Sequence, residues 1–211
     1  MRMPLFILGG PLLWLVMPAP AQAQSVPDYF EITDITVNGA GCIPGSVSKN
    51  VAADKLSFTL GFQNYVAEVG PYLNPSDARK SCQMNISLKI PAGWRFAIAS
   101  FDYRGYMNLD AGISAEHKTS YYFQAFEKTG EFSSTKVGPE QKDFRFQQQV
   151  DLNEVHWSAC DNKRSLNIKT AIRLWNSDRT KYPNASGVMG TDAIDGQFQD
   201  QNWKLAWGRC P

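Results

Sequence analysis

Histidine is scarce in this chain, and the common catalytic motifs are missing from it. The 211 residues contain two histidines, His117 and His156, and neither belongs to a recognisable nucleophile motif. There is no G-x-S-x-G, no H-E-x-x-H, no EF-hand loop and no glycine-rich phosphate loop. These absences argue against the serine hydrolase, zinc protease, calcium-sensor and nucleotide-binding classes. We interpret both histidines as surface or packing residues.

The chain also lacks an excess of charge of one sign. Beyond its first residues it lacks a long apolar run as well. Lys and Arg number 21 against 20 Asp and Glu, a formal net charge of +1. A nucleic acid partner would require a basic surplus, so none is expected. No later segment approaches the roughly 20 apolar residues that span a bilayer, so we expect no membrane insertion of the mature chain.

The apolar N-terminal segment has the features of a secretory signal peptide. Arg2 gives it a basic start, an apolar run follows, and Ala21-Gln22-Ala23 forms a small-residue cleavage site. We predict a signal peptide over residues 1–23. No linker, repeat or charge block divides the rest, which predicts a single domain over residues 24–211. The mature protein is therefore expected to be secreted, either extracellular or periplasmic.

The cysteines predict disulfide bonds. None of the four, Cys42, Cys82, Cys160 and Cys210, belongs to a C-x-x-C pair, and thiols of exported proteins oxidise. Of the three possible connectivities we favour Cys42–Cys82 with Cys160–Cys210, because each bond then closes one half of the chain. A zinc site is the alternative, but neither histidine lies at ligand spacing from a cysteine. We expect no cofactor.

The middle of the sequence has the clearest structural pattern. Apolar residues alternate with polar ones over 82–90, and the alternation resumes after Trp94, with a Pro-Ala-Gly turn between. This pattern predicts two strands joined as a β-hairpin. The apolar positions change phase before Phe101, which predicts either a β-bulge or burial of the strand on both faces.

The same alternation recurs along the rest of the chain, without a long apolar stripe of helical period. About nine or ten strands separated by Gly, Pro and Asn turns predict an all-β fold, a two-sheet antiparallel β-sandwich stabilised by disulfides. A closed β-barrel is the alternative, since strand spacing does not distinguish closure from stacking. Residues 65–81 and 177–190 are rich in turn-forming and polar residues and are predicted as loops.

Several short motifs resemble those of a known family. In chain order they are Gly41-Cys42, Pro44-Gly45-Ser46, Ala67-Glu68-Val69-Gly70-Pro71, Ser76-Asp77-Ala78-Arg79-Lys80-Ser81-Cys82-Gln83, Asp102-Tyr103-Arg104-Gly105, Tyr121-Tyr122-Phe123, Trp157-Ser158-Ala159-Cys160 and Trp207-Gly208-Arg209-Cys210. Together they resemble the secreted domain-of-unknown-function family numbered 4360, found in fungi and bacteria. Ile43 departs from the pattern by separating the cysteine from the proline. The resemblance implies secretion and paired cysteines, but no established activity and no catalytic residues.

Carboxylates are the remaining candidates for catalysis. A polysaccharide hydrolase needs two acids across a cleft, and Asp102 ends a predicted strand beside Arg104. We favour a structural ion pair instead, because the two residues lie two positions apart on one strand face. Asp192 and Asp195 could bind calcium in a loop, but two carboxylates are an incomplete ligand set. No metal is therefore expected.

Aromatic residues outside the core pattern predict a binding surface. Exposed rings can stack on sugars, and Tyr106, Tyr122 and Trp175 are the candidates. We therefore predict a secreted, non-enzymatic module that binds an extracellular glycan or surface protein. The alternatives are a carboxylate-dependent polysaccharide hydrolase and a structural envelope or matrix protein. Asn85 and Asn184 begin N-glycosylation sequons, which matter only in a eukaryotic source.

Overall fold

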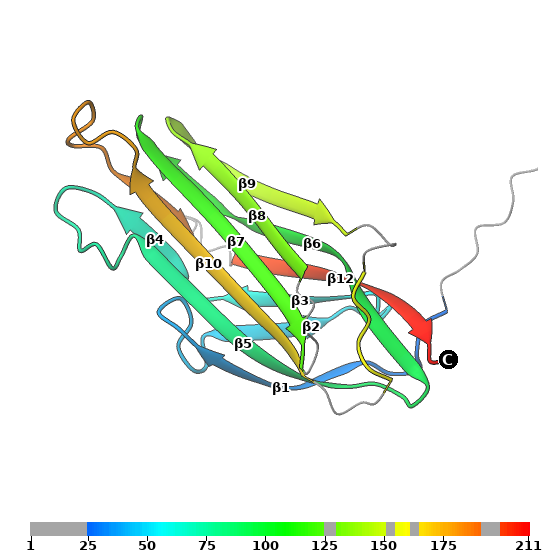
Figure 1. Cartoon of the computed structure of the whole chain (residues 1–211). Helices are drawn as coiled ribbons and strands as arrows, with labels where there is room; N and C mark the ends of the chain where they lie inside the picture. The colour runs from blue at the N-terminus through cyan, green and yellow to red at the C-terminus, as the bar shows by residue number, and fades with distance from the viewer. Residues whose placement is uncertain (1–24, 125–129, 151–154, 161–164, 191–198) are drawn as a thin grey trace, which may run out of the picture.

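Two antiparallel sheets make up the described part of the chain, residues 25–124, 130–150, 155–160, 165–190 and 199–211 of a computed structural model (Figure 1). These residues contain twelve strands and no helix, which confirms the predicted all-β sandwich. Among them no helical segment is long and apolar enough to cross a bilayer. The predicted signal peptide, residues 1–23, and the calcium candidates Asp192 and Asp195 lie outside the described residues.

Each sheet is built from strands that are distant in sequence. The five-stranded sheet has the order β1 (Glu31–Asn38), β5 (Arg79–Lys89), β10 (Leu166–Asn176), β7 (Ile113–Phe123) and β8 (Gly130–Val137). The seven-stranded sheet has the order β2 (Val47–Val51), β3 (Ser57–Phe62), β12 (Gln199–Arg209), β6 (Trp94–Leu109), β11 (Gly187–Gly190) and β4 (Val66–Val69), with β9 (Glu140–Gln149) also paired to β6. The described strands do not close into a barrel.

The core lies between the two sheets because the inward positions of the strands are apolar and often aromatic. Phe101 of β6 and Trp203 of β12 are almost fully buried, with ring centroids 4.8 Å apart. On the opposite sheet Tyr121 of β7 meets the edge of Trp203 at 5.9 Å. Such contacts across the core favour stacking of the sheets by burial of large apolar area.

The hairpin predicted in the middle of the sequence is wrong, although its two strands are correct. β5 pairs with β1 and β10, whereas β6 pairs with β12, β9 and β11, so the intervening turn carries the chain from one sheet to the other. Ile90 and Trp94 flank this turn and are both buried, which favours the crossing. Of the two explanations for the change of phase, the bulge is present: Ile98 pairs with Leu205 and Ser100 with Lys204, which leaves one residue of β6 unpaired.

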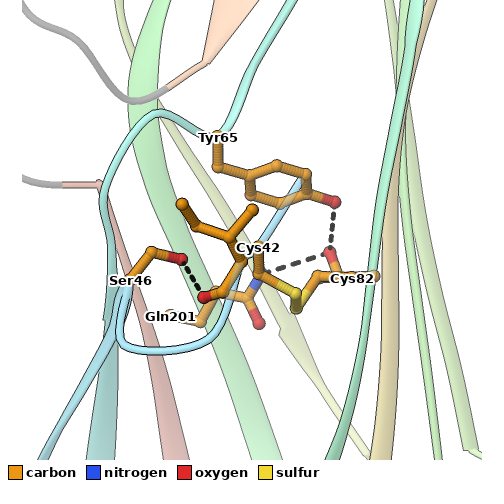
Figure 2. The surroundings of a disulfide bond; sticks show 7 residues. Cys42, Ser46, Tyr65, Cys82 and Gln201 are labelled. Carbon is orange, nitrogen blue, oxygen red and sulfur yellow. Dashed lines mark hydrogen bonds between the residues drawn. A yellow bond between two sulfur atoms is a disulfide. The ribbon is translucent and has the colours of Figure 1, made fainter. Parts of the chain in front are cut away.

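Both disulfides have the favoured connectivity. Cys42 bonds Cys82, Cys160 bonds Cys210, and no free cysteine remains to hold zinc. Figure 2 shows the first bond, which ties the loop between β1 and β2 to β5. Because β1 and β2 lie in different sheets, this bond fixes a crossing of the chain between them.

A buried polar cluster lies beside this disulfide and joins the sheets. The Thr170 hydroxyl of β10 lies 3.1 Å from Gln201 Nε2 of β12, which donates to it. Figure 2 shows Gln201 and Tyr65 beside the Cys42–Cys82 bond. The same hydroxyl is 3.0 Å from Thr119 Oγ1 and 2.9 Å from His117 Nε2, both on β7, and 3.5 Å from the Tyr65 hydroxyl. His117 is 1% exposed, so it is a core residue.

Candidate functional site

A large groove lies at one end of the sandwich, between two loops. Residues 70–78 connect β4 to β5, and residues 177–186 connect β10 to β11. Figure 1 shows these two loops at the same end of the molecule. The groove between them has a volume of about 870 Å³, and the end of β10 forms its floor. This volume is in the range of pockets that hold small ligands or a few sugar rings.

Two outward side chains of β10 line the groove. Leu174 points into the core and is 2% exposed, so Arg173 and Trp175 on either side of it point outward. The Arg173 guanidinium carbon lies 5.3 Å from the centre of the Trp175 ring, a cation–π contact. Trp175 is half-buried and borders the groove. The site therefore includes an aromatic ring in contact with a neighbouring cation.

Two further arginines border the same groove. Arg79, the first residue of β5, is directly opposite Arg173 in the ladder between β5 and β10. Arg179 comes from the loop after β10. Among the described residues no Asp or Glu lines the groove, and none of the three arginines forms an ion pair with a described residue. The groove is therefore cationic in a nearly neutral protein.

The loop over 70–78 is held by short-range backbone hydrogen bonds. The Asp77 amide donates to the Asn74 carbonyl at 2.9 Å, and the Glu68 amide donates to the Asp77 carbonyl at 2.9 Å. Lys80 Nζ also pairs with the Asp77 carboxylate at 3.1 Å. These contacts close the loop as a set of turns against β4 and β5, so the groove wall is held by contacts within the chain.

The loop over 177–186 is anchored at both ends. Asn176 Nδ2 donates to the Tyr182 carbonyl at 2.7 Å, and the Asp110 carboxylate accepts from the Ser186 amide at 2.8 Å and the Ser186 hydroxyl at 2.9 Å. The Tyr182 ring packs on Gly112, where an added Cβ would lie 2.3 Å from Tyr182 Cδ2. The second wall is therefore also preformed.

The three aromatic candidates from the sequence do not come together. Tyr122 lies on the same outer sheet face as Trp175, but it is opposite Asn167, eight residues along β10 from Trp175. That spacing is about 26 Å along the strand. Tyr106 lies on β6, on the outer face of the other sheet. Of the three, Trp175 borders the groove and Tyr122 and Tyr106 do not.

Asp102 is engaged in an ion-pair cluster away from the groove. Its carboxylate is almost buried, and Arg145 Nε lies 2.9 and 2.7 Å from the two carboxylate oxygens. Arg145 Nη2 contacts the same carboxylate, and Arg104 Nη2 lies 3.7 Å away. These contacts support the structural interpretation of Asp102 and Arg104. Within the described parts of the chain, no group of three or more His, Cys, Asp or Glu side chains is placed to hold a metal.

A second, smaller hollow of about 240 Å³ opens between β8 and β9. These strands follow each other in sequence but belong to different sheets, so the hollow reaches toward the core. Its walls include Phe101, His117, Phe132 and Phe146. The small size of this hollow suits a saccharide less well than the larger groove does.

The sequence contains only a weak indication that these arginines lie together at a groove. Arg173 and Trp175 occupy outward positions of the most regular late strand, so their shared face could be read from the alternation. Arg79 lies 94 positions before Arg173 in the sequence (173 minus 79). Only the pairing of β5 with β10 brings Arg79 next to Arg173.

Fold and groove together define a class: a disulfide-stabilised, all-β protein with a preformed cationic groove at one end. The chain belongs to the domain of unknown function family DUF4360, which matches residues 28–210. It is 38% identical over 184 residues to an uncharacterized secreted protein of Arthroderma benhamiae, across 87% of this chain and 73% of that protein. The protein is secreted.

Two solved structures are distant likenesses of this chain. The structure of TmCBM61 in complex with β-1,4-galactotriose has a TM-score of 0.27 and 12% identity, covering 85% of this chain and 91% of that chain. Tailspike protein 4 of bacteriophage CBA120 has a TM-score of 0.24 and 11% identity, covering 86% of this chain and 19% of that chain. At these scores neither likeness bears on function.

Proposed function

We propose that this secreted protein is a non-enzymatic glycan-binding domain whose ligand lies in the groove between residues 70–78 and 177–186. The observation that carries the proposal is the position of Trp175 on the floor of a preformed groove of about 870 Å³. In this proposal residues 1–23 direct export, and residues 24–211 act as one domain.

The groove combines the two kinds of group that bind sugars. An aromatic ring such as Trp175 offers a flat apolar surface to the C–H face of a pyranose. Around it, Asn74, Ser76 and Arg179 line the groove with groups that hydrogen-bond hydroxyls. Because both loops are held by internal hydrogen bonds, little ordering is needed on binding. These features support a saccharide more than an extended apolar partner.

Replacing Trp175 tests the proposal. The purified mature protein is screened on a glycan array, and the best ligand is then titrated by calorimetry against wild type and Trp175→Ala. We expect a dissociation constant at least about tenfold higher for the variant, since losing a stacked ring costs about 1.4 kcal/mol or more. Tyr122→Ala is the matched control, because it removes a half-buried ring from the same sheet face outside the groove.

Two results would contradict the proposal. One is an array without any bound glycan, which would favour the structural envelope or matrix alternative. The other is unchanged binding by Trp175→Ala. Released sugars are assayed in the same samples, because release that disappears in Asp102→Asn while the variant remains folded would make the protein a hydrolase.

A further inference from the structure

The pairing of two arginines across the groove floor is electrostatically unfavourable. Arg79 and Arg173 are directly opposite on neighbouring strands, with Cβ atoms roughly 5 Å apart. Like charges in this position destabilise a sheet. On the other side of Arg173 its neighbour across the ladder is Glu116, which forms no ion pair with it among the described contacts. Glu116 lies at the same cross-strand spacing and offsets part of this repulsion, so the unfavourable interaction that remains at the site is the one between the two arginines.

The acids near the groove do not neutralise it. Asp77 pairs with Lys80, and Asp178 interacts with Lys181: its carboxylate accepts from the Lys181 amide at 3.0 Å and attracts the positive charge of the same residue. Arg179 adds a third positive charge from the opposite wall. Three guanidinium groups thus border one hollow that no described carboxylate lines, in a chain whose formal net charge is +1. Such a local excess is a site complementary to an anion.

We infer that the ligand of the groove is an acidic glycan, in which the sugar ring packs on Trp175 and the anionic groups accept hydrogen bonds from Arg79, Arg173 and Arg179. This inference rests on the proposed function. Guanidinium groups are suited to carboxylates and sulfates because their planar donors bind two oxygens at once. A sugar carboxylate and a sugar sulfate share this chemistry, and the experiment separates them.

The test compares ligands that differ only in charge. Polygalacturonate is titrated beside its methyl-esterified form, and dextran sulfate beside dextran, with polyglutamate as a non-sugar polyanion. We expect an acidic glycan to bind at least about tenfold more tightly than its neutral counterpart, since 1.4 kcal/mol is tenfold. The binding should weaken as salt is raised from low to physiological concentration. Polygalacturonate alone assigns the anion as carboxylate, and dextran sulfate alone assigns it as sulfate.

Single charges in the groove are then removed. Arg79→Gln and Arg173→Gln should each weaken binding of the acidic glycan about tenfold. Lys169→Gln is the matched control, because Lys169 is an exposed cation on the same strand and face, about 13 Å from Arg173. Arg79→Gln should also raise the melting temperature of the free protein, because it relieves the repulsion with Arg173. If Arg79 has a purely structural role, Arg79→Gln should instead lower the melting temperature.

The outcomes distinguish this inference from the proposed function. If a neutral glycan binds, is lost in Trp175→Ala and is retained in both arginine variants, the acidic-ligand inference is wrong and the proposed function stands. If polyglutamate binds as well as the acidic glycans and Trp175→Ala has no effect, both are wrong, and the groove binds polyanions by charge alone. If no saccharide binds, both are likewise overturned.

Discussion

Asp102 lies on the outer face of β6, where both of its carboxylate oxygens accept hydrogen bonds from Arg145 of β9. The sequence places Asp102 and Arg104 on one strand face, and the structure agrees, with 3.7 Å between them. Arg145 is closer, but it is 43 residues away in sequence and its position depends on the pairing of β9 with β6. Residue types and strand faces could therefore be predicted here, and the principal partner could not.

Neutralising this carboxylate should destabilise the fold. Asp102→Asn leaves Arg145 and Arg104 close together without their counter-ion, so we expect the free energy of unfolding to fall by about 1–3 kcal/mol. Urea denaturation measures the change, and a double-mutant cycle with Arg145→Met isolates the pair. Unchanged stability of Asp102→Asn would contradict the structural role assigned to this residue.

At the level of elements, the two groove loops show what local sequence can and cannot specify. Residues 70–78 and 177–186 are loops, as their turn-forming residues predict, but each predicted loop also contains a short strand, β4 or β11. These two strands pair with each other, Gly187 opposite Val69, and so bring the loops to the same place. Four-residue strands lack a measurable alternation, so the groove could not be predicted.

Gly112 positions one of these loops, and its substitution should weaken binding. Gly112 has φ +87° and its Cα lies under the Tyr182 ring, so Gly112→Ala both strains the backbone and displaces Tyr182. Gly93→Ala is the control, because Gly93 has φ +78° and open space around it. Each substitution should cost about 1–2 kcal/mol in stability from the left-handed backbone. Glycan affinity by calorimetry should fall several-fold only for Gly112→Ala, and an equal loss in both variants would show that the Tyr182 contact does not shape the groove.

For the whole molecule, the fold class and both disulfides could be predicted, whereas the arrangement of strands could not. Alternation identifies which residues of β5 and β6 face the core, because it depends only on period two. It does not say which sheet a strand joins, and the short turn between β5 and β6 wrongly favoured a hairpin. The buried polar cluster around Thr170 was also missed, since its members come from strands of both sheets.

This cluster should make the stability of the whole protein depend on pH. Burial lowers the pKa of His117 from 6.5 to about 3, so the folded protein keeps this imidazole neutral while the unfolded chain protonates it. The contribution of this neutral imidazole to the free energy of unfolding is complete above pH 6.5. It is lost as the pH falls toward 3, by about 1.4 kcal/mol for each pH unit. Urea denaturation at several pH values measures this slope, and His117→Gln should reduce it. If the free energy of unfolding depends on pH equally in wild type and in His117→Gln, His117 is not the source of the pH dependence.

The position of β12 has a consequence for how the protein is made. This strand follows all the others in the chain, yet it lies between β3 and β6 in the seven-stranded sheet and contributes Gln201 and Trp203 to the core. During synthesis the β2–β3 pair can therefore join the group of β6, β9, β11 and β4 only after β12 has emerged, because β12 is the strand that links them. The C-terminal strand is therefore the one that completes both the seven-stranded sheet and its share of the core.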